Sequence, residues 1–313
     1  MSEAMMKTKE KSRPVATVIT RTFTAPPILG CLKAAEEFTG RPLKFKWSNE
    51  RQERFVKDFA GRIDDLKELK DEIQSIADQD VEVINKFLRD RGFDIQLRPT
   101  SGTTFSVASV LDILVEWIEE GKKRDIWRLN GDVRESYPGV YLKAGVLLCD
   151  GLGWEPLVKI ATKSGKDEVW IMPLSAETEV NDDLDIPLMI KQATLELEDY
   201  RHDEADYDEY EGVVFPMIDY NREVDISWLQ GLWVNDTWWI EEAIQQTKFR
   251  MNEKGARAQS AVAMTMRCLS LDEPKKPVVI DKPFLLWISR KGVSLPVFAG
   301  VFAKDAWRRP EEL

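Results

Sequence analysis

The residues that could do acid–base or metal chemistry are few and poorly placed for catalysis. The chain has one histidine, His202, in a mostly acidic run between Glu196 and Glu211. A Ser-His-Asp or Cys-His site would have to be built around it, whereas its setting is typical of a solvated loop. The same run lacks the Gly and the terminal bidentate Glu of an EF-hand loop. We therefore expect no catalytic residue and no metal site, and a protein that is not an enzyme.

The cysteines indicate free thiols. Cys31, Cys149 and Cys268 are odd in number, far apart and in no C-x-x-C pair, which favours a reducing compartment over a disulfide framework or a zinc site. Cys268 follows Arg267, so an exposed loop would make its thiol reactive. A packed, inert thiol fits the same sequence equally well. Nothing in the sequence indicates a cofactor, and we expect none.

Composition argues against two classes of partner. The net charge of -11 and the hydrophobic fraction of 43% describe an acidic globular chain. Such a surface repels phosphate backbones and anionic lipid, so we expect neither a nucleic-acid nor a membrane partner. Residues 1–21 lack the continuous apolar segment of a signal peptide, and no stretch approaches the roughly 18 apolar residues of a spanning helix. A cytoplasmic location is expected.

Helices are expected mainly before residue 125. Apolar residues from Phe55 to Ile76 recur every three or four positions, which predicts one long amphipathic helix opened by Ser48 or Asn49. Gly92 and Gly121 follow two further periodic stretches and fit helix ends. The expected helices cover residues 48–76, 78–91 and 105–120, and a half-buried strand is expected at 93–97.

Short apolar runs bounded by turn residues predict strands after residue 140. Gly165, between two of these runs, fits the positive φ of a hairpin turn. We expect a mixed α+β fold, with helices mainly N-terminal and antiparallel strands C-terminal. A charged tail at 1–20 would precede a single domain at 21–313. The expected strands cover residues 140–149, 156–162, 168–174 and 213–220.

Four segments in the last third share the pattern of a known family. Residues 248–258 contain Asn-Glu-Lys-Gly followed by small residues. Residues 281–288 begin Asp-Lys-Pro-Phe, residues 297–301 read Val-Phe-Ala-Gly-Val, and residues 215–220 lie upstream. In type, order and spacing these segments resemble the hinge and closing strands of the serpin family. Residues 21–100 show no such likeness and form a divergent helical part.

The resemblance implies a reactive-centre-type loop with assigned residues. The family's spacing, counted from Glu253, places the cleaved bond between two residues near the end of the loop, and an arginine before it is an alternative recognition residue for a trypsin-like peptidase. The implied hinge residues are Glu253, Gly255, Ala256 and Ala258, the implied cleaved bond joins Leu269 and Ser270, and the alternative recognition residue is Arg267.

Side chains of an inserted strand point alternately to its two faces. After Gly255 one set is small or apolar, and the other set holds both charges of the segment. No Pro or aromatic residue interrupts 256–269, so the segment could join a sheet. Without its flanking matches the same stretch would fit an ordinary amphipathic strand or helix. The first set is Ala256, Ala258, Ser260, Val262, Met264 and Met266, and the second is Arg257, Gln259, Ala261, Ala263, Thr265 and Arg267.

A weaker likeness concerns the receiving sheet. Residues 105–109 resemble the Ser-Pro-x-Ser start of the helix under the serpin breach, with Ser106 and Ser109 as the serines and Val107 replacing the proline. Between Gly121 and Val140 nothing resembles the middle of the main sheet. We therefore expect the gap that could receive the loop to be absent or rebuilt from unrelated segments, and cleavage of the loop should shift the melting temperature by only a few degrees.

The resemblance implies a serpin-like protein that presents this loop to a serine or cysteine peptidase as an inhibitor or bait. The alternative is a noncatalytic scaffold or assembly protein that keeps a serpin-like half without inhibitory activity. Both functions require a protein partner, a peptidase in the first case. A hydrolase is disfavoured because the chain has a single histidine.

Overall fold

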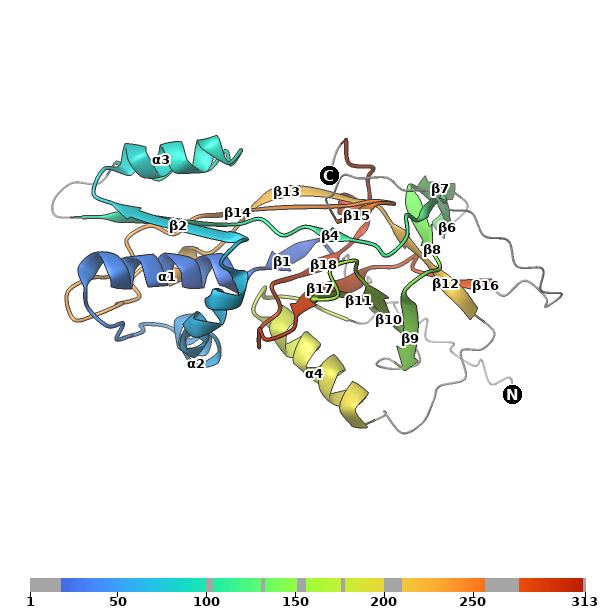
Figure 1. Ribbon diagram of the computed structural model, residues 1–313, viewed down its shortest axis with the longest axis horizontal. Coiled ribbons are helices and arrows are strands. Elements are labelled where there is room, and N and C mark those ends of the chain that lie inside the picture. Colours follow the sequence, from blue (N-terminus) through green and yellow to red (C-terminus); the bar gives the residue numbers. More distant parts are fainter. Residues whose placement is uncertain are drawn as a thin grey trace, which may run out of the picture.

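The computed structural model describes residues 18–99, 104–130, 133–150, 156–175, 178–199, 210–256 and 276–311. Figure 1 shows an elongated molecule in which α1, α2 and α3 gather at one end and β6, β7, β8, β12 and β16 at the other. Within these ranges no helix is long and apolar enough to cross a membrane. The elements form an α+β fold, as the sequence predicts.

The predicted long helix over 48–76 is three elements. Asn49 opens α2 as expected, because its side chain accepts a hydrogen bond of 2.9 Å from the Gln52 backbone N–H. The helical spacing does not continue, since Ile73 and Ile76 lie in a strand paired antiparallel with another strand. The helix predicted at 78–91 is confirmed as α3. The first elements are β1 Arg21–Phe23, α1 Ala25–Thr39, α2 Glu50–Asp58, the 3-10 helix η1 Ala60–Leu69, β2 Ile73–Asp78 and α3 Val81–Asp90.

The prediction of a helix at 105–120 is wrong. The segment instead supplies β3 Ser106–Leu111 and β4 Val115–Glu116, and β5 Lys122–Lys123 follows it. β-Branched residues such as Val107, Val110 and Val115 favour extended backbone, and their spacing fits either period. Pairing of β3 with β2 decides in favour of the strand.

The comparison of Ser106 and Ser109 with a helix start is therefore also wrong, because both lie on β3. Both α1 and α3 pack against β2 and β3, and α1 lies on the side of Ser109. It begins with Pro26 and Pro27 in its first turn, where the missing N–H groups of proline cost no helical hydrogen bond.

The strands predicted after residue 140 are confirmed with shifted boundaries, and Gly165 takes φ +63° in the turn between β10 and β11. One sheet has the order β1-β18-β17-β11-β10-β9, and a second has the order β16-β12-β8-β5. A hairpin, β6–β7, leaves the second sheet after β5. The remaining elements are β6 Ile126–Asn130, β7 Val133–Tyr137, β8 Gly139–Leu142, β9 Val146–Asp150, β10 Pro156–Ala161, β11 Asp167–Pro173, α4 Asp185–Asp199, β12 Tyr210–Pro216, β13 Ile218–Val224, η3 Ser227–Leu229, β14 Gln245–Met251, β15 Gly255–Ala256, β16 Lys276–Val279, β17 Phe284–Arg290, β18 Phe298–Phe302 and η4 Lys304–Ala306.

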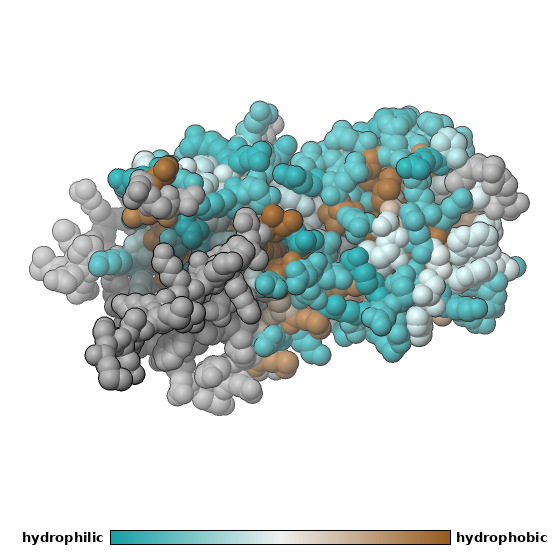
Figure 2. All heavy atoms as spheres, turned by 180° about the vertical axis from the view of Figure 1, so that it is seen from behind, coloured by the Kyte–Doolittle hydropathy of each residue, from teal (hydrophilic) through white to brown (hydrophobic). Residues whose placement is uncertain are grey.

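A continuous apolar core joins these layers. Phe215, Phe284 and Phe302 are fully buried within it. Asp167 on β11 and Arg290 on β17 form a buried ion pair of 2.6 Å, and Arg290 also contacts Glu72 just before β2. Because a buried charge is tolerated only with such partners, this network fixes β2 to the six-stranded sheet. On the face seen in Figure 2, the coloured residues are mainly hydrophilic, with scattered hydrophobic ones.

Candidate functional site

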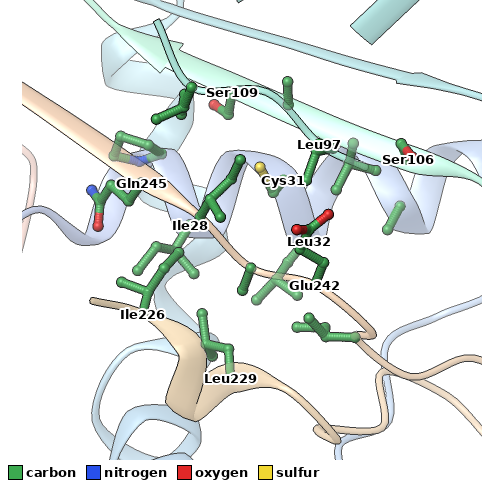
Figure 3. Close-up of a pocket in the computed structure, with 18 of the residues that line it drawn as sticks. Ile28, Cys31, Leu32, Leu97, Ser106, Ser109, Ile226, Leu229, Glu242 and Gln245 are labelled. Atoms are coloured by element: carbon green, nitrogen blue, oxygen red, sulfur yellow. The ribbon is translucent and has the colours of Figure 1, made fainter. Parts of the chain in front are cut away.

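Two separate strand pairs flank a gap. β2 pairs with β3, and β13 pairs with β14, both antiparallel. Within the described ranges no ladder joins β3 to β14. A cavity of about 630 Å³ lies between them, with α1 behind it (Figure 3). Of the two expected alternatives, an absent gap does not hold, because residues 106–111, predicted as part of a helix, supply one of its two edges.

The walls of this gap are mostly apolar. Figure 3 shows Ser106 and Ser109 on the β3 side, Gln245 and Glu242 on the opposite side, and Cys31 on α1 between them. Ser106 and Ser109 thus line the candidate site, although the helical position inferred for them is wrong. Apolar lining residues include Ile28, Leu32, Leu97, Ile226 and Leu229.

The back of the gap is formed by α1, which approaches β2 and β3 closely. A Cβ atom on Gly30 would lie only 2.2 Å from Ser109 Oγ and 2.8 Å from Ser75 Oγ, so this contact requires glycine. The two serine hydroxyls hydrogen bond each other at 2.9 Å. Burial raises the pKa of the Cys31 thiol to about 12, although a hydrogen bond with the Ser109 backbone acts to lower it. The thiol stays protonated at neutral pH and acts as a small packing group rather than a nucleophile.

A strap, defined here as residues 93–98, crosses the outer side of the gap. On the β3 side, Leu97 N–H donates to Asn85 Oδ1 of α3 at 2.9 Å. On the β14 side, Asp94 N–H donates to Gln246 Oε1 at 2.8 Å, and Arg98 N–H donates to Glu242 Oε2 at 2.9 Å. The strand predicted at 93–97 is therefore wrong. The backbone N–H groups of the strap donate to side-chain oxygens, and the strap joins no strand ladder in the described part of the chain. Its expected half-burial is confirmed, because Ile95 packs with the outer face of β3.

The predicted hinge enters the gap at one end. Gly255 pairs with Glu116, and Ala256 with Val115, so β15 forms a short antiparallel ladder with β4. The turn before it is closed by a 2.9 Å hydrogen bond from Asn252 N–H to the Gly255 carbonyl. The first two residues after the turn therefore already occupy a strand position at the mouth of the gap.

Trp117 holds this hinge in place. Its backbone N–H donates to the Lys254 carbonyl at 3.2 Å, and its indole Nε1–H donates to the Asn252 carbonyl at 3.0 Å. The ring is fully buried and meets Phe215 edge to face at 5.9 Å. A buried indole with its N–H satisfied makes a rigid anchor. Sequence reasoning missed Trp117 because it placed the residue on a helix.

Glu253 is the second anchor of the hinge. It is only 8% exposed, and its carboxylate pairs with Lys123 on β5 at 2.9 Å. Its carbonyl accepts a hydrogen bond of 2.7 Å from the Gly121 N–H. Glu253, Gly255 and Ala256 are thus brought together at the mouth of the gap. The other predicted residues, Ala258, Arg267, Leu269 and Ser270, lie outside the described residues.

Replacing Gly255 should detach the hinge. Gly255 has φ +154°, and an added Cβ would lie 2.3 Å from the Val115 carbonyl oxygen. Such backbone costs about 1–3 kcal/mol for a residue with a side chain, and the clash adds to it. We expect Gly255→Ala to lower the free energy of unfolding in urea more than Gly165→Ala does, because Gly165 also has positive φ but open space around it. Equal losses would show that β15 contributes nothing to holding the fold.

No group of three or more His, Cys, Asp or Glu side chains in the described part of the chain could hold a metal ion. The site therefore consists of a gap, a strap and an anchored hinge. Its physical capacity is to accept an extended segment, because, among the described residues, β3 and β14 each present an edge without a ladder partner toward the same cavity.

Comparisons with known proteins show which fold this chain shares. A family model described as serpin (serine protease inhibitor) matches residues 221–304, which span β14, the hinge, β16, β17 and all of β18. The chain is similar to the crystal structure of maspin, with a TM-score of 0.56 at 12% identity, covering 91% of this chain and 92% of maspin. The chain has a serpin-like fold.

Two further solved structures share the fold of this serpin-like protein. The thermophilic serpin tengpin, in the native state, has a TM-score of 0.54 at 12% identity and covers 95% of this chain and 90% of its own. Thyroxine-binding globulin in complex with thyroxine has a TM-score of 0.53 at 10% identity, covering 90% and 92%. A search of curated proteins found no sequence match.

The family match and the shared fold support a serpin-family assignment. At the level of the family, serpins are generally protease inhibitors rather than enzymes, and they typically bind target proteases.

Proposed function

We propose that this serpin-like protein inhibits a serine or cysteine peptidase, with residues 257–275 as the bait and Leu269-Ser270 as the bond that is attacked. The observation that carries the proposal is the ladder between Gly255–Ala256 and β4 at the mouth of the cavity between β3 and β14. A bait segment that continues this ladder can move into the gap once its bond is cut.

The existing ladder sets the register of such an insertion. Ala256 lies opposite Val115, and the same antiparallel register continued along β3 puts Val262 opposite Ser109. Directly opposed side chains share one face of a sheet. Since Ser109 touches α1 at Gly30, Val262 and the residues two positions away from it would face α1 and the apolar cavity. This is the small or apolar set of the segment.

The strap accounts for the other face. In the same register Ala261 falls opposite Val110, and Ala263 falls opposite Ala108. Val110 and Ala108 pack with Ile95 of the strap, so only small side chains would fit there. In this register the two charged residues of this set, Arg257 and Arg267, would fall outside the stretch opposite Ala108 and Val110. The alternation of the bait segment thus matches the α1 face and the strap face at once, which an unrelated amphipathic strand would not need to do.

Insertion of the cleaved bait segment would inhibit the peptidase. A serine or cysteine peptidase forms a covalent acyl intermediate with the carbonyl of the residue before the cut, here Leu269. Insertion of the segment that begins at residue 257 would move that carbonyl away from the place where the peptidase bound. The active site of the displaced peptidase would then lose the geometry that attack of water on the acyl bond needs.

A panel of serine and cysteine peptidases tests this function. The intact protein is incubated with each enzyme and resolved by denaturing electrophoresis and mass spectrometry. We expect a covalent complex with at least one peptidase, attached through Leu269 or, for a trypsin-like enzyme, Arg267. Nicking between 257 and 275 without any complex would overturn the inhibitor and favour the noncatalytic scaffold.

A further inference from the structure

The β6–β7 hairpin exposes an apolar face with a cation on it. Trp127 is 53% exposed and Leu129 is 74% exposed. The Arg134 guanidinium lies 4.3 Å from the centre of the Trp127 ring, and the register Leu129↔Arg134 puts all three side chains on one face. Burying such a face requires a partner, because water solvates its two apolar members poorly.

The hairpin is rigidly attached to the body of the protein. Ile126, at its base, is buried, and the ring of Tyr137 at the opposite base meets Trp307 edge to face at 5.2 Å. Lys304 also contacts Glu135 on β7. A surface held in this way loses little conformational entropy when it binds.

The hairpin lies beside both ends of the bait segment. Arg128 Nη1 donates to the Asp281 carbonyl, just after β16, at 2.7 Å. Lys123, three residues before β6, pairs with Glu253 of the hinge. Figure 1 shows β6 and β7 at the same end of the molecule as β15 and β16, and Figure 2 shows hydrophobic residues on the surface at this end.

We propose that the exosite, defined here as Trp127, Leu129 and Arg134, is a second contact surface for the peptidase that attacks the bait. This rests on the proposed function. Leu269 is seven residues from Lys276, so a peptidase bound there lies within about 25 Å of β16. A globular domain of roughly 250 residues has a radius of gyration of about 18 Å. Its body must therefore extend beside the bait and over the neighbouring hairpin.

The side chains of the exosite indicate which kind of peptidase surface it would bind. Trp and Arg are the residue types that most often dominate binding energy at protein interfaces. The stacked Arg134 places a positive charge on a protein of net charge -11, so the complementary patch beside the peptidase cleft is apolar with an acidic rim. Opposite charge at such a patch speeds association more than it deepens affinity.

The test compares rate constants of complex formation with the peptidase found by the panel. We expect the double variant Trp127→Ser/Leu129→Ser to lower the second-order rate constant about tenfold or more. Arg134→Glu should also lower this rate constant, by a larger factor at low salt than at high salt. The matched control is Leu188→Ser/Leu195→Ser on α4. These leucines are similarly exposed, and α4 packs on β1 and β18. The control should leave the rate unchanged.

The outcomes separate the two proposals. Covalent complex formed at the wild-type rate by both exosite variants would overturn the exosite while the proposed function stands. Absence of a complex with any peptidase would overturn the proposed function itself. Thermal melts of each variant check folding, and a fully folded Arg134→Glu protein supplies the answer if the double serine variant is unstable.

Discussion

Cleavage of the Leu269-Ser270 bond is expected to raise the melting temperature by about 10 °C or more. In the proposed register Val262, Met264 and Met266 enter the apolar cavity, and burial stabilises each by about 1.5–3 kcal/mol. If hydrogen bonds to the edges of β3 and β14 offset the ordering of the backbone, about 4 kcal/mol or more remains. For a large domain 1 kcal/mol corresponds to about 2–4 °C.

The measurement is a pair of thermal melts on intact protein and on protein nicked in the bait segment. Mass spectrometry locates the cut, and both halves stay in the sample. A shift of only a few degrees was expected from the sequence, on the ground that the receiving gap is absent or rebuilt from unrelated segments. The larger shift is now expected because β3 and β14 flank a cavity of about 630 Å³. A small shift would now mean that the strap or α1 prevents entry of the segment.

The variant Ser260→Arg is expected to abolish the covalent complex, with a loss of at least about 100-fold in its yield relative to nicked product. In the proposed register residue 260 lies opposite Leu111 and faces α1. An unpaired charge buried there costs several kcal/mol, and 100-fold corresponds to about 2.7 kcal/mol. The peptidase should still cut the bait, so the variant becomes a substrate.

The neighbouring substitution Gln259→Arg is the matched control. It introduces the same side chain one position away, and in the proposed register it points to the outer face. We expect it to form complex like the wild-type protein. Equal loss in the two variants would contradict the register, and no loss in either would show that the complex forms without insertion.

The C-terminal third was predictable from sequence because its signals are local. Strands β14, β17 and β18 each carry their pattern within a few consecutive residues, and the hinge turn at Asn252 to Gly255 depends on residues that touch one another. Glu253, Gly255 and Ala256 lie together in this turn and the short strand after it, and their role as a hinge stays a prediction. Their positions in the chain determine their positions in space.

The receiving side was not predictable in this way. Val107, Val110 and Leu111 satisfy a helical period as well as a strand, and only pairing with β2 selects the strand. Trp117 and Lys123 belong to the site because they contact a hinge more than a hundred residues later in the chain. A single sequence gives no information about such contacts. The helix behind the gap, α1, was likewise missed because its role depends on the close approach at Gly30.

The short ladder between β15 and β4 has a kinetic consequence. Starting a new strand pairing requires a costly search, because the chain must close a loop before any contact forms. Gly255 and Ala256 already form the first pairs of such a ladder, so the rest of the segment could pair residue by residue with the edges of β3 and β14. Hairpin zippering takes about 1–10 μs, whereas peptidases turn over at about 1–1,000 per second. Under the proposed function, insertion would therefore be faster than hydrolysis of the acyl intermediate, and the covalent complex would accumulate.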